Sequence, residues 1–159
     1  MRIGDFLEAH EWEVLERREG ALRVRAHLPR QVKNPFGALF GGFTPTYVDF
    51  IALHTWWAGR EPTPGRPRLV TLNMRVDYYA PIVHEHFEMD SHVVHRRGTT
   101  CWVETRFYCP EGDMLAFAYT TLKANIRAGN LGKEGSRRRR KAESKPIVFR
   151  PEAAQPYDD

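Results

Sequence analysis

The chain has 159 residues, of which 42% are hydrophobic and 12% aromatic, enough for one domain with its own core and no disulfide support. Its formal net charge of +4 lies entirely in residues 127–159, because residues 1–126 contain equal numbers of basic and acidic residues. The folded part therefore carries no overall field favouring nucleic acid, and no segment has the roughly 20 apolar residues that a membrane span needs.

The two cysteines, Cys101 and Cys109, fall on one expected strand and at its end. Two cysteines spaced along one extended strand are too far apart to form a disulfide. Since no secretory leader follows Met1, we expect a reduced, cytoplasmic protein.

The first elements in chain order are short. Residues 2–12 can form an amphipathic helix, and residues 12–28 predict two strands around Glu19-Gly20, because apolar side chains alternate there. A loop rich in Pro and Gly follows and leads into the most apolar segment of the chain.

That segment predicts a helix of about four turns. Thr44-Pro45 is typical of an N-cap followed by Pro at the first helical position, and Gly59 is typical of a helix end. The helix is apolar nearly all round, which favours a helix surrounded by other structure.

Asp49 is the only formally charged residue between Gly41 and Gly59. A lone acid in a helix is usually solvated or a cap, but the neighbours Val48 and Phe50 argue against solvation here. An ionised carboxylate out of water is costly unless it is paired, hydrogen-bonded or shifted in pKa, so Asp49 needs an explanation.

Four alternating runs follow, at residues 69–80, 86–96, 100–109 and 114–126, with turns at Gly98 and at residues 110–113. Strict alternation assigns one face of the first run to Val70, Leu72, Met74, Val76 and Tyr78, and the other face to Thr71, Asn73, Arg75 and Asp77. The order of elements predicts an α+β fold over residues 1–126, a curled antiparallel β-sheet wrapped around one long central helix. Residues 127–159 have the composition of a disordered basic tail.

The spacing of Asn34, Gly41, Gly42 and Asp49 resembles the helix-entry motif of the PaaI-type (phenylacetate-pathway) acyl-CoA thioesterases, which have the hotdog fold. Residues 70–82 resemble the third strand of that family, and residues 93–123 resemble its closing strands. The similarity spans roughly residues 10–125. The resemblance implies a thioester hydrolase that needs no cofactor, since coenzyme A is part of the substrate.

The resemblance also implies roles for four residues. Asp49 would activate water or attack the thioester directly, and Asn34 would support the water or the thioester. Gly42 would hold the oxyanion through its N–H, a role that also suits donors left unsatisfied at a helix start. Thr71 would assist the carboxylate. Because alternation turns Thr71 away from the apolar face, we expect it not to reach Asp49 of its own chain.

In the family, the oxyanion glycine and the carboxylate come from different subunits, so the resemblance implies a homodimer or homotetramer with shared sites. Phe40, Gly41 and Phe43 would bound an apolar pocket for an aryl or medium-chain acyl group. The basic tip formed by Arg96, Arg97 and Gly98 would contact the phosphates of CoA, although such a tip is more often simply solvated.

The chain departs from the family at Phe40, where relatives have His. That change favours one alternative, a hotdog protein that binds acyl-CoA or acyl-carrier protein without hydrolysis. A hydratase or dehydratase is a weaker alternative, since Asp49 and His54 are five residues apart and point to different sides of a helix. The histidines at 84, 86, 92 and 95 show no fixed ligand spacing, so we expect no metal.

Overall fold

The structure, a computed structural model, describes residues 7–60 and 67–125. The predicted tail, the first residues of the predicted N-terminal helix and the loop at 61–66 lie outside this range. Within it, the predicted order of two strands, one helix and four strands is confirmed. The elements are η2 (Ala9–Glu11), β1 (Glu13–Arg18), β2 (Ala21–His27), η3 (Arg30–Val32), α1 (Thr44–Trp57), β3 (Arg68–Tyr78), β4 (His86–Arg97), β5 (Thr100–Tyr108) and β6 (Met114–Asn125).

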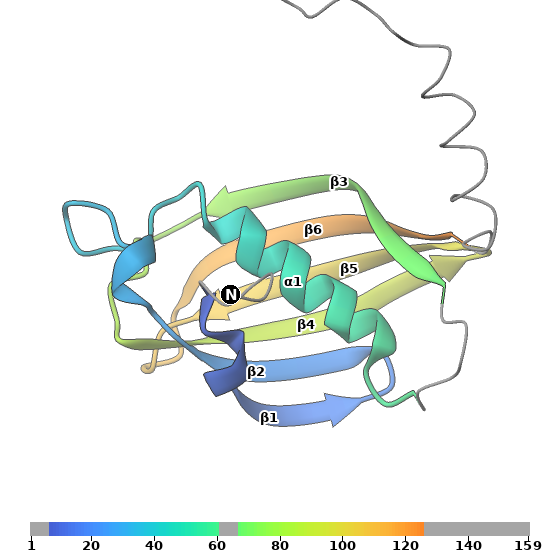
Figure 1. The fold of residues 1–159 in the computed structure, drawn as a ribbon, viewed down its shortest axis with the longest axis horizontal. Coiled ribbons are helices and arrows are strands. Elements are labelled where there is room, and N and C mark those ends of the chain that lie inside the picture. Colours follow the sequence, from blue (N-terminus) through green and yellow to red (C-terminus); the bar gives the residue numbers. More distant parts are fainter. Residues whose placement is uncertain (1–6, 61–66, 126–159) are drawn as a thin grey trace, which may run out of the picture. The chain divides into compact units, whose positions relative to one another are not determined.

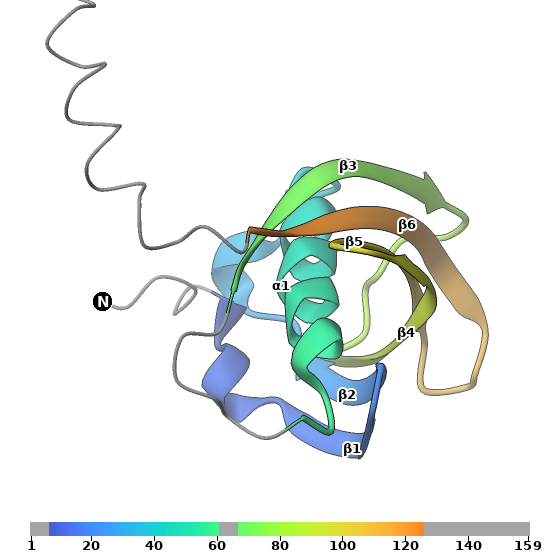
Figure 2. The same cartoon turned by 90° about the vertical axis from the view of Figure 1, so that its right-hand side faces the viewer.

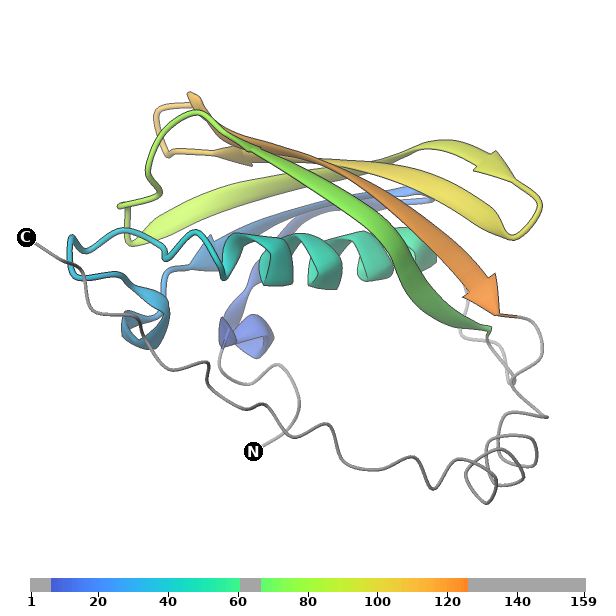
Figure 3. The same ribbon diagram turned by 90° about the horizontal axis from the view of Figure 1, so that it is seen from above.

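The six strands form one antiparallel sheet in the order β1-β2-β4-β5-β6-β3. The sheet curls, and α1 lies along its concave side, as Figures 1 and 2 show. Seen from above in Figure 3, the strands pass over one side of the helix. The predicted fold, a curled antiparallel sheet around one long helix, is confirmed.

Aromatic and aliphatic side chains fill the space between α1 and the sheet. Tyr47 packs edge-on against Phe87, with ring centroids 5.4 Å apart, and Phe87 stacks on Phe107 at 5.8 Å. All three are almost completely buried, as are Val48 and Ile51 of the helix. Burial of each such side chain stabilises the fold by about 1.5–3 kcal/mol, so the helix is held mainly by this contact.

The ends of α1 agree with the prediction to within about a turn. Phe43 occupies the N-cap without a side-chain capping bond, and Thr44 is the first helical residue rather than the cap. The helix ends before Gly59, whose φ is 68°. A Cβ at Gly59 would lie 2.5 Å from the backbone nitrogen of Glu19, so only glycine allows this close approach to the β1–β2 turn.

The prediction of a helix wrapped by other structure holds for the side of α1 that faces the sheet, and not for its whole surface. The buried helical residues face the sheet: Thr44, Tyr47, Val48, Ile51, Ala52, Thr55 and Trp56. The less buried residues form a continuous stripe at helical spacing: Thr46, Asp49, Phe50, Leu53, His54 and Trp57. We call these six residues the uncovered stripe. Figure 2 shows that the sheet curls around one side of the helix. The six stripe residues are correspondingly half-buried or exposed.

Strict alternation along β3 is also wrong, because the strand contains a β-bulge. Thr71 pairs with Leu122 and Asn73 with Thr121, so Leu72 is an extra residue with no partner on β6. Leu122 is fully buried, which places Thr71 on the inner face of the sheet. Beyond the bulge the inner positions move to the even-numbered residues, and Leu72 itself is 55% exposed.

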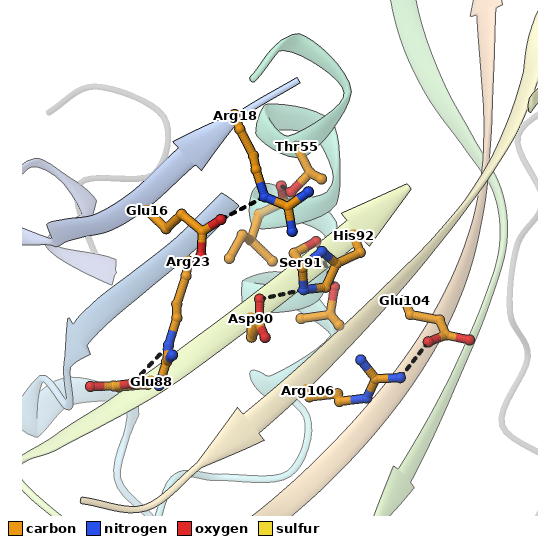
Figure 4. Close-up of polar contacts among 12 residues, drawn as sticks. Glu16, Arg18, Arg23, Thr55, Glu88, Asp90, Ser91, His92, Glu104 and Arg106 are labelled. Atoms are coloured by element: carbon orange, nitrogen blue, oxygen red, sulfur yellow. Dashed lines mark hydrogen bonds and ion pairs between the residues drawn. The ribbon is translucent and has the colours of Figure 1, made fainter. Parts of the chain in front are cut away.

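The outer face of the sheet carries charged side chains in pairs (Figure 4). Each pair joins residues on one strand or on neighbouring strands, namely Arg18–Glu16, Arg23–Glu88, His92–Asp90 and Arg106–Glu104, each at 2.6 Å. Partly solvated pairs of this kind add little to stability but keep this face polar. Among the described residues, no helix combines the length and apolar character needed to cross a membrane.

Candidate active site

The carboxylate of Asp49 lies on the uncovered stripe and accepts a hydrogen bond from the hydroxyl of Thr71 on β3. Asp49 is half-buried, so its carboxylate remains accessible from one side. The contact corrects the expectation that Thr71 cannot reach Asp49 within one chain. The bulge at Leu72 is the physical reason, because it turns Thr71 inward while Met74 and Val76 also stay inward.

A second group of predicted residues surrounds the start of α1. Gly42 is exposed, and a Cβ built on it would lie 3.0 Å from the ring of Phe40, so a side chain here would crowd that ring. The Gly42 N–H has no backbone partner among the described residues. Phe40 is 52% exposed and packs edge-on against Phe43 at 6.1 Å. The loop therefore presents an available backbone donor beside two aromatic rings.

Tyr78 is a residue at this loop that the sequence analysis missed. Its hydroxyl donates to the carbonyl oxygen of Gly41 at 2.8 Å, which ties the loop to the end of β3. Tyr78 ends the strand that resembles the family's third strand, but neither spacing nor composition shows which backbone group its hydroxyl meets.

Asn34 shapes the loop before the two glycines. Its side-chain oxygen accepts the N–H groups of Phe36, at 2.9 Å, and Ala38, at 3.1 Å. Its backbone N–H donates to the carbonyl of Ala38 at 2.7 Å. The turn interpretation of Asn34 thus has direct structural support, and any contact with substrate would have to come from the amide nitrogen.

The predicted phosphate residues lie at the other end of the helix. Gly98, with a φ of 58°, forms the β4–β5 hairpin tip. The guanidinium of Arg96 lies 4.6 Å from the ring centroid of Trp56, in the last turn of α1. A 14-residue helix is about 20 Å long, so one chain does not bring Arg96 and Gly42 together.

Comparison with known proteins then identifies the family. The family description "Thioesterase superfamily" matches residues 36–116, just over half of the chain. The chain belongs to the thioesterase superfamily. The matched segment contains Gly42, Asp49, Thr71 and Arg96, and begins two residues after Asn34.

Solved structures agree with this thioesterase-superfamily fold. A hypothetical thioesterase from Streptococcus pneumoniae, solved with coenzyme A, is 21% identical over 73% of this chain and 87% of its own, with a TM-score of 0.62. A Streptococcus mutans protein bound to acetyl-CoA is 18% identical over 72% and 89%, with a TM-score of 0.61. Mouse thioesterase superfamily member 2 is 19% identical over 74% and 84%, with a TM-score of 0.61. At these identities the likeness shows the fold. No curated protein matches the sequence significantly.

This thioesterase-superfamily chain has a cavity of about 190 Å³ between α1 and strands β1 and β2. The cavity lies beside Phe50, the residue that follows Asp49. Apolar and aromatic side chains dominate its lining, which comprises Ala9, Trp12, Val14, Arg17, Leu22, Val24, Phe50, Ile51 and His54. The sequence analysis did not find this cavity, because its walls come from segments up to 45 residues apart.

His54 lines the cavity rather than the carboxylate site. Its ring packs on that of Phe50, with centroids 4.5 Å apart, while Asp49 points to β3. Partial burial, and the nearby Arg17 guanidinium to a lesser extent, lower the pKa of His54 below its ordinary value. The expected separation of Asp49 and His54 on the helix is therefore present, which removes the main argument for a hydratase.

Proposed function

We propose that this protein is an acyl-CoA thioesterase of the PaaI type, with the Asp49 carboxylate as general base or nucleophile. The observation that carries the proposal is the contact between Asp49 and Thr71 on the uncovered stripe. A half-buried carboxylate that is the only acid in α1 contributes little to folding but suits a reaction that consumes water. Family membership and the solved neighbours that hold coenzyme A or acetyl-CoA give further support.

In the proposed reaction, water adds to the thioester carbonyl and the C–S bond then breaks. The Thr71 hydroxyl holds Oδ1 of Asp49, which leaves Oδ2 to accept the proton of the attacking water. The Gly42 N–H donates to the oxyanion that forms on the carbonyl oxygen. The CoA thiolate leaves and takes up a proton, giving the free acid and CoA. The reaction needs no cofactor beyond the coenzyme A of the substrate.

The complete site requires two copies of the chain. Gly42 and Asp49 are about 10 Å apart along the direction of α1, too far for both to contact one carbonyl carbon. The uncovered stripe and the unpaired edge of β3, where Val70 and Leu72 are 46% and 55% exposed, offer apolar surface for a second copy. We propose a homodimer, or a homotetramer built from it, in which Gly42 of one copy serves Asp49 of the other.

The acyl group would occupy the 190 Å³ cavity beside Phe50. A cavity of about 150 Å³ is known to hold benzene, so this volume suits one aryl ring or a medium-length chain. Phe40 and Phe43 would contact the pantetheine arm, and Arg96, Arg97 and Gly98 of one copy would contact the CoA phosphates.

Both cysteines are free and buried, which suits a cytoplasmic protein.

The deciding experiment measures free-thiol release from short, medium, long and aryl acyl-CoA esters. We expect turnover by the wild type and a loss of about 10²-fold or more in both Asp49→Ala and Asp49→Asn. The turnover of Thr71→Val should fall about tenfold, which corresponds to the loss of one hydrogen bond to a charged group, whereas Thr71→Ser should keep most of the activity. An Asp49→Asn variant as active as the wild type would refute the proposed base.

A second candidate function is acyl-CoA or acyl-carrier-protein binding without hydrolysis. Phe40, at the position where relatives have His, is the observation that favours it. Tight acyl-CoA binding with no thiol released from any ester would establish this alternative. Phe40→His would then be the variant in which to look for restored turnover.

A further inference from the structure

A cluster of possible metal ligands lies at the end of the sheet, outside the proposed active site. His84 belongs to the connection between β3 and β4, and Cys109 and Glu111 belong to the turn between β5 and β6. Their ligand atoms, one from each side chain, all lie within 4.8 Å of one another. No pattern in the sequence joins them, because His84 is 25 residues from Cys109 and only the fold brings them together.

The distances between the ligand atoms of the three side chains can be compared with those of a zinc site. His84 Nε2 is 3.9 Å from a carboxylate oxygen of Glu111. Tetrahedral zinc sites with Zn–S of about 2.3 Å and Zn–N or Zn–O of about 2.0–2.1 Å place their ligand atoms about 3.3–3.6 Å apart. From separations of up to 4.8 Å, the ligand atoms need to approach one another by up to about 1.2–1.5 Å, within the reach of side-chain rotation in His84 and Glu111, which are not buried.

Cys109 is the residue that makes the cluster selective. Its side chain is buried, and its sulfur accepts the backbone N–H of Asp113 at 3.2 Å, which fixes the position of the sulfur at the turn. Its sulfur lies within 4.8 Å of a carboxylate oxygen of Glu111 and of a ring nitrogen of His84.

We propose that His84, Cys109 and Glu111 bind a divalent, borderline-soft metal ion of the zinc class. A thiolate, an imidazole and a carboxylate together suit zinc better than magnesium or calcium, which prefer oxygen ligands alone. On binding, the ion forms a bond to the Cys109 sulfur and the thiol proton passes to solvent. Water completes the coordination, because Glu111 is exposed and gives solvent access.

The ion would join the β3–β4 connection to the β5–β6 turn. Ile82, two residues before His84, accepts the N–H of Leu39 at 2.8 Å, so the same connection supports the segment that leads to the glycine loop. The site is therefore structural rather than catalytic, and the proposal does not depend on thioester hydrolysis.

A second cluster, of Glu8, Glu11 and His27, provides a matched control. It lacks a thiol, and His27 and Gln31 already hydrogen-bond the Glu8 carboxylate. Oxygen and nitrogen ligands alone cannot give the absorption of a metal–thiolate bond, so the two clusters can be told apart by spectroscopy.

The test titrates the full-length, reduced protein with Co²⁺, which substitutes for zinc and is visible, and then displaces it with Zn²⁺. We expect one equivalent to bind with a thiolate-to-cobalt charge-transfer band. Cys109→Ser should abolish that band, and His84→Gln and Glu111→Gln should each weaken binding about tenfold or more. His27→Gln should change nothing.

Two results would overturn the proposal: no charge-transfer band in the wild type, or a band that survives Cys109→Ser. A thermal-unfolding series gives an independent reading, since one equivalent of Zn²⁺ should raise the Tm of the wild type but not of His84→Gln. Because His84 is partly exposed, we expect the His84→Gln variant to fold even if the Cys109→Ser variant does not. An equal rise in Tm for both proteins would also count against the site.

Discussion

Two buried threonines on neighbouring strands differ in one respect. Thr105 on β5 and Thr120 on β6 are both fully buried. The Thr105 hydroxyl is 3.1 Å from that of Ser91, whereas the Thr120 hydroxyl has no hydrogen-bond partner among the described residues. A buried hydroxyl without a partner costs free energy, and a paired one does not.

We therefore predict opposite effects for the same substitution. Thr120→Val should raise the free energy of unfolding by about 1 kcal/mol, because it removes an unsatisfied group. Thr105→Val should lower it by about 1 kcal/mol, because it leaves the Ser91 hydroxyl alone in the core. Urea denaturation of the two variants measures both effects. Equal destabilisation by the two variants would show that side-chain shape, rather than hydrogen bonding, determines stability at these two positions.

His54 predicts a dependence of stability on pH. Its pKa is lower in the folded chain than its ordinary value of 6.5, so the unfolded chain binds more protons in the window just below pH 6.5. Stability should fall as the pH drops from 6.5 through the folded pKa, and should not change above 6.5 on account of this residue. The difference in unfolding free energy between wild type and His54→Gln, measured at pH 7.5 and at pH 5, isolates the effect. A difference in unfolding free energy that is the same at both pH values would contradict this role of His54.

Among the elements, β3 shows what sequence pattern can and cannot predict. Alternation and turn residues predict all six strands and the helix to within a few residues, because periodicity reports burial directly. The bulge leaves no such mark, since both Thr71 and Leu72 are ordinary strand residues. Motif spacing singled out Asp49, but the contact with Thr71 required the actual register of β3 on β6.

The register also predicts which deletion the strand tolerates. Removing Leu72 should restore a regular ladder, with Thr71 and Met74 still facing inward, and should change stability little. Removing Val70 instead should turn Leu69, which packs against the core, to the outer face and destabilise the fold by about 2 kcal/mol. Thermal unfolding of the two deletion variants compares them. Similar losses from both would mean that the bulge is not where the register places it.

At the scale of the whole molecule, the two edges of the sheet differ. The β1 edge carries Glu13, Glu16 and Arg18, all engaged in ion pairs, and a bulge between Val14 and Glu16. The β3 edge exposes Val70 and Leu72. Charges protect an edge strand from pairing with another chain. Four of the six β1 residues are charged, whereas residues 69–74 of β3 carry no formal charge, so we expect pairing at β3 rather than at β1.

If the proposed dimer forms through β3, a charge on that edge should separate it. Leu72→Lys should give a monomer by sedimentation and lower thioesterase activity at least tenfold, because the shared site is lost. Glu16→Lys on the β1 edge is the control and should leave both properties unchanged, since Glu16 is exposed and lies outside the lining of the cavity. A dimeric, active Leu72→Lys protein would place the interface elsewhere.

The unequal edges also bear on aggregation. A sheet with two open edges can add copies at both and grow into a fibre, whereas a sheet with one open edge can add only a single copy. Two chains that meet at β3 leave only the charged, bulged β1 strands at the ends of the joined sheet. Growth through the sheet edges would then stop at two copies without any further structure to limit it.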